Sequence, residues 1–363
     1  MMDRISAIRQ NLKISNLDAA LISSYENWRY FSGFTGSHAY LVITSSDQVL
    51  ITDPRYTEQA SQQAAGWKVI THGLDVMPSL QQAFKSNGAV SVGFETQKIS
   101  DFEIGRLRES LPNITWVPME DIGKQLRAIK NDEELTYIRQ AVRIADLAVE
   151  ELIGIVIPGM TERDAAIELD YRLAKHGSEG PAFGTIVATG ARGALPHATP
   201  SGQVISRGDM IVVDCGAMYH GYRSDITRTL WVGEPNSKMR EIFDVVLASQ
   251  QAALAVIRPG ITGGEVDFAH REVFRRHNLE QYSLRGLGHG VGLEIHELPR
   301  VVMDTSEVIQ AGMIFTVEPG LYLPGIGGVR IEDMVEVTQD GCEILTQCPK
   351  VLRIPAAAAV EES

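Results

Sequence analysis

Residues 213–230 read VDCGAMYHGYRSDITRTL and carry two aspartates, Asp214 and Asp225, on either side of a turn. The apolar β-branched run that leads into Asp214 and the run ITRTLWV after Asp225 are typical of strands, and YHGY between them contains a glycine suited to a tight turn. A hairpin with its tip at Tyr219 and His220 would place the two carboxylates directly opposite each other, with Cβ atoms about 5 Å apart. Like charges in that position repel, so the sequence implies that something neutralises them.

The hairpin belongs to one half of an internal repeat. IPGMTERD at 157–164 recurs as RPGITGGE at 258–265. In both copies a helix ends at Pro-Gly, and a threonine, Thr161 or Thr262, then caps the next helix. Two copies are too few for a solenoid, so the repeat predicts a duplicated α+β unit folded face to face.

The acidic residues follow the same repeat. GDMIVVDCG at 208–216 has a counterpart in AGMIFTVEPG at 311–320, where an acid again stands two residues before a glycine. In this second copy Glu318 and Glu332 are centred on Gly325, which predicts a second pair of carboxylates facing each other across a hairpin. We therefore expect the acids of both halves to converge where the halves meet.

Two pairs of facing carboxylates would destabilise the fold unless divalent cations neutralised them. Four carboxylates could hold two ions about 3.5 to 4 Å apart, a spacing that lets a bridging water become hydroxide near neutral pH. GLGHGVGLEIHELPR supplies His289 and His296, of which one could bind metal while the other faces substrate, although on a regular strand they would point to opposite faces. His197, in a loop before the first acidic strand, is a second substrate-facing candidate. A site of four carboxylates and one imidazole favours Mn²⁺, with Co²⁺, Zn²⁺ and Fe²⁺ as alternatives.

Composition limits the class of protein. The chain has 363 residues, enough for two domains, and a formal net charge of −13, which argues against a nucleic-acid backbone or an anionic membrane as the main partner. Its three cysteines, Cys215, Cys342 and Cys348, form no metal-type pair and fit reduced thiols. The first residues resemble neither a signal peptide nor a membrane span, so we expect a cytoplasmic protein.

The helix and strand pattern changes near residues 122–132. The first part alternates helix-like and strand-like runs and predicts a compact α/β domain over 1–124. A long amphipathic helix then follows, for which Asn131 or Asp132 is a plausible cap. We expect a second domain over 125–354 and a flexible tail over 355–363.

Several segments together resemble the signatures of the pita-bread metallopeptidases, in particular the Xaa-Pro dipeptidase (prolidase) and Xaa-Pro aminopeptidase branch. They are VVDCGAMYHGYRSDITRT, GLGHGVGLEIHELPR, GMIFTVEPGLY and GGVRIED. ENWRYFSGFTGS and ITDPRYTEQA near the start look like the creatinase-type N-terminal domain. The resemblance implies an α+β fold, with a pita-bread catalytic domain after a creatinase-type α/β domain.

The resemblance also implies residue roles. A dinuclear metal site would be held by Asp214, Asp225, His289, Glu318 and Glu332. Glu318 would also serve as general acid and base in the attack of hydroxide on an Xaa-Pro bond, while His296 and His197 would steady the substrate and the oxyanion. Arg330 would orient the groups around the ligands.

Substrate-binding residues follow from the same resemblance. Arg300 matches an arginine that in prolidases meets the proline carboxylate, although small Xaa-Pro aminopeptidases share it, and Tyr322 is a further substrate-binding candidate. Family members complete the proline pocket from the N-terminal domain, often that of the partner in a homodimer, which directs attention to Trp28, Tyr30 and Arg55. An alternative for these three residues is that they only pack their own domain.

The sequence leads us to expect an exopeptidase for small proline-containing peptides. The sequence does not distinguish a dipeptidase from an aminopeptidase, although it slightly favours an aminopeptidase or a mixed activity. The alternatives are a methionine aminopeptidase-type activity, creatine hydrolysis on the same fold without metals, and a non-catalytic peptide-binding scaffold. Retention of all five ligand positions argues against the last two.

Overall fold

The computed structural model describes residues 3–120 and 122–354 and divides into two compact units, 1–127 and 128–363. The division falls within α6 (Lys124–Ala128), at residue 127 where the sequence suggested 124. The expected tail, 355–363, lies outside the described residues. Each unit has a hydrophobic core of its own.

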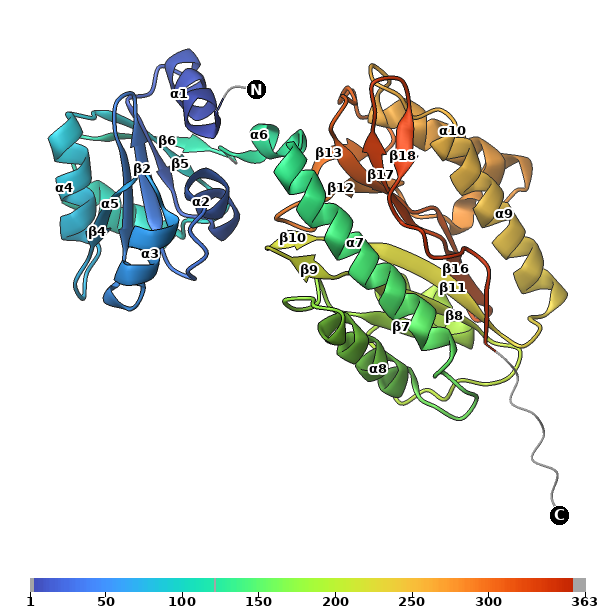
Figure 1. Cartoon of the computed structure of the whole chain (residues 1–363). Coiled ribbons are helices and arrows are strands. Elements are labelled where there is room, and N and C mark those ends of the chain that lie inside the picture. The colour runs from blue at the N-terminus through green and yellow to red at the C-terminus, as the bar shows by residue number, and fades with distance from the viewer. Residues whose placement is uncertain (1–2, 121, 355–363) are drawn as a thin grey trace. The chain divides into compact units, whose positions relative to one another are not determined.

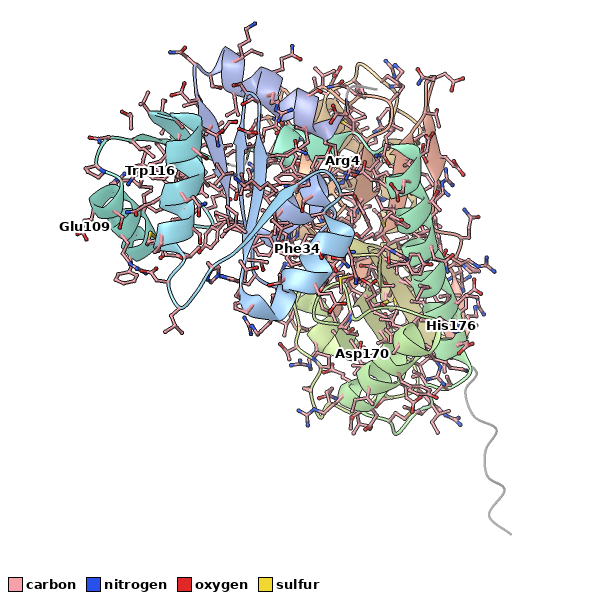
Figure 2. All side chains as sticks on the ribbon, turned by 60° about the vertical axis from the view of Figure 1, so that its left-hand side comes forward. Arg4, Phe34, Glu109, Trp116, Asp170 and His176 are labelled. Atoms are coloured by element: carbon pink, nitrogen blue, oxygen red, sulfur yellow. The ribbon has the colours of Figure 1, made fainter. Side chains whose placement is uncertain are left out.

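The first unit is built on a six-stranded sheet in the order β4-β3-β2-β1-β5-β6 (Figure 1). Its core packs α4 and α5 on the sheet, and Trp116, labelled in Figure 2, meets Phe84 and Phe94 edge-on. The strands are β1 (Ala19–Ile22), β2 (Tyr40–Thr44), β3 (Gln48–Thr52), β4 (Lys68–Thr71), β5 (Ser91–Glu95) and β6 (Thr115–Met119). The helices are α1 (Arg4–Ile14), α2 (Tyr25–Ser32), the 3₁₀ helix η1 (Pro54–Tyr56), α3 (Thr57–Gln63), α4 (Met77–Asn87) and α5 (Asp101–Ser110).

The second unit contains a four-stranded sheet, β19-β11-β8-β7, and a five-stranded sheet, β13-β12-β14-β17-β18, with two short ribbons, β9-β10 and β15-β16. Strands of the first half are β7 (Ile186–Thr189), β8 (Met210–Cys215), β9 (Met218–Tyr219), β10 (Tyr222–Arg223) and β11 (Ile226–Val232). Strands of the second half are β12 (Gly288–Gly290), β13 (Glu297–Val301), β14 (Ile314–Val317), β15 (Gly320–Leu323), β16 (Gly327–Arg330), β17 (Asp333–Val337), β18 (Cys342–Ile344) and β19 (Leu352–Ile354).

Two helix pairs confirm the predicted repeat. α7 (Asp132–Ile153) precedes α8 (Glu162–Lys175) as α9 (Ser237–Leu254) precedes α10 (Gly263–Arg276). Thr161 and Thr262 each cap the second helix of their pair through a capping box, and Asn131 caps α7 in the same way. Strands β8, β11 and β16 lie between the two pairs (Figure 1), and the 3₁₀ helices η2 (Gly190–Ala194) and η3 (Glu280–Tyr282) complete the unit.

The hairpin between β8 and β11 differs from the expectation in its register. Its two-residue turn is His220-Gly221, both with positive φ, and not Tyr219-His220. A tight hairpin turn of this kind needs positive φ at both central positions, so the glycine takes the second one. Asp214 consequently pairs with Thr227, and Asp225 lies diagonally from it on the same face. The prediction that the two aspartates face each other directly was wrong, but the shared face was right.

Candidate active site

Five ionisable side chains from both halves of the second unit meet at the ends of its strands. Asp214 is the penultimate residue of β8 and Asp225 immediately precedes β11. Glu318 immediately follows β14 and Glu332 immediately precedes β17. His289 is the central residue of β12.

Glu318 and Glu332 keep the register expected from their centring on Gly325. The strand pairs on either side of them are Val317 with Asp333 and Gly320 with Arg330. One continuous register joins these pairs, and in it Glu318 stands opposite Glu332.

Three of the carboxylates could hold one ion together, and His289 links them to Glu318. One carboxylate oxygen each of Asp214, Asp225 and Glu332 lies within 4.8 Å of the other two. His289 Nε2 lies 3.3 Å from Glu318 Oε1 and 3.7 Å from Asp225 Oδ2. The structure therefore brings together all five residues that the sequence singled out as ligands.

Burial and mutual repulsion dominate the electrostatics of the cluster. Burial, together with the charge of Glu332, raises the pKa of Asp225 well above its usual range. Burial and the charges of Glu318 and Asp214 do the same to the pKa of Glu332. For Glu318 burial acts in the same direction, but the hydrogen bond and charge of His289, together with Arg330 and Thr316, outweigh it and hold the pKa of that carboxyl below its usual value.

The residues present fit divalent cations. Asp214 Oδ1 and Glu332 Oε1 are buried and have no hydrogen-bond partner among the described residues. A buried carboxylate oxygen without a partner is costly, and so is the repulsion between neighbouring carboxylates. Hard divalent ions with carboxylate and imidazole donors would remove both costs.

Arg330 connects the cluster to its surroundings. Its Nη2 donates to Asp214 Oδ2 at 2.6 Å, its Nε to Thr227 Oγ1 at 2.9 Å and its Nη1 to Tyr322 Oη at 2.8 Å. Arg330 is 4% exposed, so the guanidinium has little contact with solvent and these bonds fix it in place. Because Nη1 also donates to Pro196 O, Arg330 joins the loop that carries His197 to the carboxylates.

The remaining candidates lie around this cluster. His296 precedes β13, and its ring centroid is 4.3 Å from that of His289, because the chain turns back between β12 and β13. The two imidazoles therefore converge and do not diverge as on one regular strand. Arg300 pairs with His289 across β12 and β13, which puts both side chains on one sheet face, and it is exposed. Tyr322 is buried and accepts from Arg330.

Two threonines of the site escaped the sequence analysis. Thr227 Oγ1 donates to Glu332 Oε2 at 2.6 Å, and Thr316 Oγ1 donates to Glu318 Oε1 at 2.9 Å. Each stands two residues from an acid along its strand, Thr227 after Asp225 and Thr316 before Glu318. The period of two on a strand was the available signal, since it puts these threonines on the face of the acids.

The three candidates for the proline pocket in the first unit, Trp28, Tyr30 and Arg55, differ in exposure. Trp28 and Tyr30 are each 6% exposed and pack within that unit, where Tyr30 Oη donates to Leu126 O. Arg55 is exposed and bonds Asp53 through two guanidinium contacts. Packing accounts for the burial of Trp28 and Tyr30.

Comparison with known proteins agrees with this geometry. The sequence model described as metallopeptidase family M24 matches residues 136–339, more than half of the chain. This chain belongs to metallopeptidase family M24. A second sequence model, described as the creatinase/prolidase N-terminal domain, matches residues 4–129. The expected fold, a creatinase-type α/β domain followed by the pita-bread domain, is confirmed.

Individual M24 proteins resemble the chain along most of its length. An uncharacterized peptidase of Bacillus subtilis is 38% identical, with 93% of this chain and 96% of that protein covered. The structure of an Xaa-Pro dipeptidase from Bacillus anthracis is 37% identical with a TM-score of 0.94, covering 96% of this chain and 98% of the other. That of an X-Pro aminopeptidase from Thermotoga maritima is 36% identical with a TM-score of 0.89, covering 95% and 100%.

Membership of M24 makes the protein a metal-dependent exopeptidase that acts on peptides. The acidic cluster is the feature of the structure that agrees with metal dependence. Within residues 3–120 and 122–354, each helix is too short or too polar to cross a lipid bilayer.

Proposed function

We propose that this protein hydrolyses Xaa-Pro bonds in small peptides, with two divalent ions held by Asp214, Asp225, His289, Glu318 and Glu332. The convergence of these five donors from both halves of the second unit carries the proposal. Relatives described as an Xaa-Pro dipeptidase and as an X-Pro aminopeptidase support the substrate class.

Glu318 is the proposed general base and acid. Its pKa is held low by His289 against the effect of burial, so the group is ionised near neutral pH and can accept a proton from an attacking water. It then passes that proton to the proline nitrogen as the bond breaks. When bound, the divalent ions supply positive charge that acidifies water and polarises the scissile carbonyl.

His296 and His197 are the proposed groups that hold the substrate carbonyl. Burial and the neighbouring His289 lower the pKa of His296, so this imidazole is neutral and can donate a hydrogen bond without adding charge. His197 is exposed, and the loop that carries it is fixed through Pro196 and Arg330. Two donors on one developing oxyanion would lower the barrier to attack.

Proline specificity needs recognition of a bond that most peptidases avoid, because the Xaa-Pro amide lacks an N–H and the ring fixes φ. Arg300 is the proposed partner of the proline carboxylate in a dipeptide. Arg300 pairs with His289 across β12 and β13 and is exposed, which supports a role for its side chain on the face of the sheet that carries His289. Tyr322 is the second proposed substrate contact.

The ion we propose is Mn²⁺, because oxygen donors outnumber the single imidazole in the ligand set. The likeness to prolidases supports a homodimer in which the N-terminal unit of the partner closes the proline pocket. Sedimentation analysis of the metal-loaded protein tests the dimer, and a monomer with full activity would reject it.

Product analysis of Ala-Pro, Ala-Pro-Ala and Ala-Leu-Ala by mass spectrometry, with Mn²⁺-loaded protein, tests the substrate. Cleavage of Ala-Pro alone means a dipeptidase, and release of alanine from Ala-Pro-Ala means an aminopeptidase. Cleavage of Ala-Leu-Ala, or of no peptide, would reject proline specificity. Asp225→Asn serves as the control and is expected to lose both activity and bound metal while keeping its fold.

A further inference from the structure

Two histidines of the first unit lie in contact, outside the carboxylate cluster of the second unit. His38 lies in the loop between α2 and β2, a loop that begins near Phe34 (Figure 2), and His72 immediately follows β4. Their Nε2 atoms are 3.3 Å apart, and the rings meet edge-on with centroids separated by 5.4 Å. His72 is 8% exposed and His38 is partly exposed, so the pair is reachable from one side.

The sheet brings these residues together. β3 lies between β2 and β4, antiparallel to β2 and parallel to β4. The start of β2 and the ends of β3 and β4 therefore lie at the same end of the sheet. Thr52 is the last residue of β3 and is fully buried. It forms hydrogen bonds with the backbones of both histidines. Its Oγ1 donates to His38 O at 2.7 Å, and its carbonyl accepts from His72 N at 2.9 Å. The spacing of the two imidazoles is therefore built into the strand ends.

The orientation of His72 leaves a lone pair directed at His38. His72 Nδ1 is 2.7 Å from Gly73 O, a contact that in the neutral ring selects the tautomer with the proton on Nδ1 and the lone pair on Nε2. Histidines that bind metal commonly have the second ring nitrogen fixed by a backbone carbonyl in this way. Burial, helped by the neighbouring His72, lowers the pKa of His38, which favours the neutral ring.

We propose that His38 and His72 form a second metal site, a bis-imidazole chelate for a divalent transition-metal ion of the Cu²⁺, Ni²⁺ or Zn²⁺ class. An ion with metal–nitrogen bonds of about 2.0–2.1 Å at a tetrahedral angle holds its two nitrogens about 3.3 Å apart, which is the spacing seen here. Imidazole nitrogen favours these ions over Mn²⁺. Water molecules would complete the coordination.

Nearby charges favour a cation at this place. The carboxylates of Asp53 and Glu103 act on His38 with a negative potential, and Arg55 opposes them. Arg55 and Asp53 form an ion pair at 2.8 Å whose charges largely offset each other, which leaves the carboxylate of Glu103 as the remaining charge that acts on His38. Without an ion the same contact is an N–H···N hydrogen bond between the rings, so the test has to detect the metal itself.

The experiment uses the full-length chain, the variants His38→Gln and His72→Gln, and the exposed His277→Gln as a matched control. Each protein is dialysed to equilibrium against the same micromolar Cu²⁺ buffer, and copper per chain is measured by mass spectrometry. All four proteins keep the carboxylate cluster, so copper bound there cancels in the differences. The electron paramagnetic resonance spectrum of wild type minus His38→Gln then reports the donors of the extra ion.

We expect wild type and His277→Gln to bind one more copper ion per chain than the other two, or with an affinity higher by about tenfold or more. The difference spectrum should show hyperfine splitting from two nitrogens. Equal copper in all four proteins, or splitting from a single nitrogen, would overturn the proposal. Circular dichroism checks folding, and if the buried His72→Gln fails to fold, the partly exposed His38→Gln decides the outcome alone.

Discussion

At the scale of single residues, two threonines on β11 have different roles: one holds a proposed metal ligand in place, and the other only stabilises the fold. Thr227 and Thr229 are both fully buried and both bond to the segment around Arg330. Thr227 Oγ1 donates to the carboxylate of Glu332 and accepts from the side chain of Arg330. Thr229 Oγ1 instead donates to Arg330 O and accepts from Arg330 N. Only the first threonine touches a proposed ligand.

Thr227→Val is therefore expected to weaken Mn²⁺ binding by about 10- to 100-fold, because Glu332 loses the donor that orients it. Thr229→Val should leave metal affinity unchanged. Both variants should lose about 1–3 kcal/mol of unfolding free energy for the buried groups that they unpair. Calorimetric titration of Mn²⁺ and urea denaturation measure the two effects, and equal metal affinities in the two variants would contradict this assignment.

The sequence identified the four acids because residue type and repeat position both pointed to them, whereas the histidines and Arg330 followed from their sequence context and from the family resemblance. It did not identify Thr227 as a partner of Glu332, because that bond joins residues 105 positions apart. The register of Asp214 was also missed, since the turn was centred one residue too early. Contacts between distant segments, and turns that depend on positive φ, are what residue patterns alone did not supply.

At the scale of elements, the glycines of β12 let neighbouring strands approach the central histidine. A Cβ at Gly288 would lie 1.9 Å from Thr316 O, and one at Gly290 would lie 2.0 Å from Leu298 O. Backbone oxygens cannot withdraw as a flexible side chain can. The two glycines are therefore needed for β12 to lie between β13 and β14 with His289 in place.

Gly288→Ala is expected to lower the unfolding free energy by about 1–3 kcal/mol and to reduce kcat/KM, because the strand that carries His289 must shift. Gly202→Ala is the matched control, since a Cβ there meets nothing within 4 Å. Urea denaturation and peptide hydrolysis measure both variants. A Gly288→Ala protein as stable and active as the control would show that β12 has more room than its contacts indicate.

The packing of α9 against α10 carries a pH dependence of its own. His270 is fully buried between Ser249 Oγ, 3.3 Å from Nδ1, and Asp267 Oδ1, 3.5 Å from Nε2. Burial lowers the pKa of His270 below its usual 6.5. The unfolded chain therefore binds this proton more readily than the folded one, and the stability that the neutral ring contributes is lost as pH falls below 6.5.

His270→Gln should accordingly flatten the decline of unfolding free energy below pH 6.5, where the steepest contribution of one group is about 1.4 kcal/mol per pH unit. His277→Gln, an exposed change at the end of α10, should keep the wild-type slope. Urea denaturation at a series of pH values measures all three proteins. Parallel curves for wild type and His270→Gln would assign the acid sensitivity to other groups.

At the scale of the whole molecule, two units with separate cores share one chain, and the five proposed Mn²⁺ ligands belong only to the second. Metal should therefore act on the two units unequally. The repeat allowed the second unit to be predicted from sequence as two like halves, and the capping boxes at Thr161 and Thr262 confirm that part.

In protein loaded with Mn²⁺ alone, removal of the Mn²⁺ with a chelator should lower the melting temperature of the unit 128–363 and leave that of 1–127 nearly unchanged. Free ion at 100 times its dissociation constant stabilises the unit that binds it by about 2.7 kcal/mol. Scanning calorimetry combined with hydrogen exchange resolves the two transitions. Equal shifts of both would mean that the units unfold together, and no shift in either would argue against the ligand set.

The pairing of β19 with β11 has a consequence for how the protein is made. β11 begins directly after Asp225, yet its outer neighbour, β19, is the last strand of the described chain, joined to it in parallel with Leu230 opposite Leu352. A ribosome makes the N-terminal segments first, so the sheet that carries Asp214 and Asp225 gains this edge strand only after residues 352–354 have been made. The proposed ligands span residues 214 to 332, so a complete ion site can form only after the second half of the repeat has been made, and the edge strand that closes the first sheet is made later still.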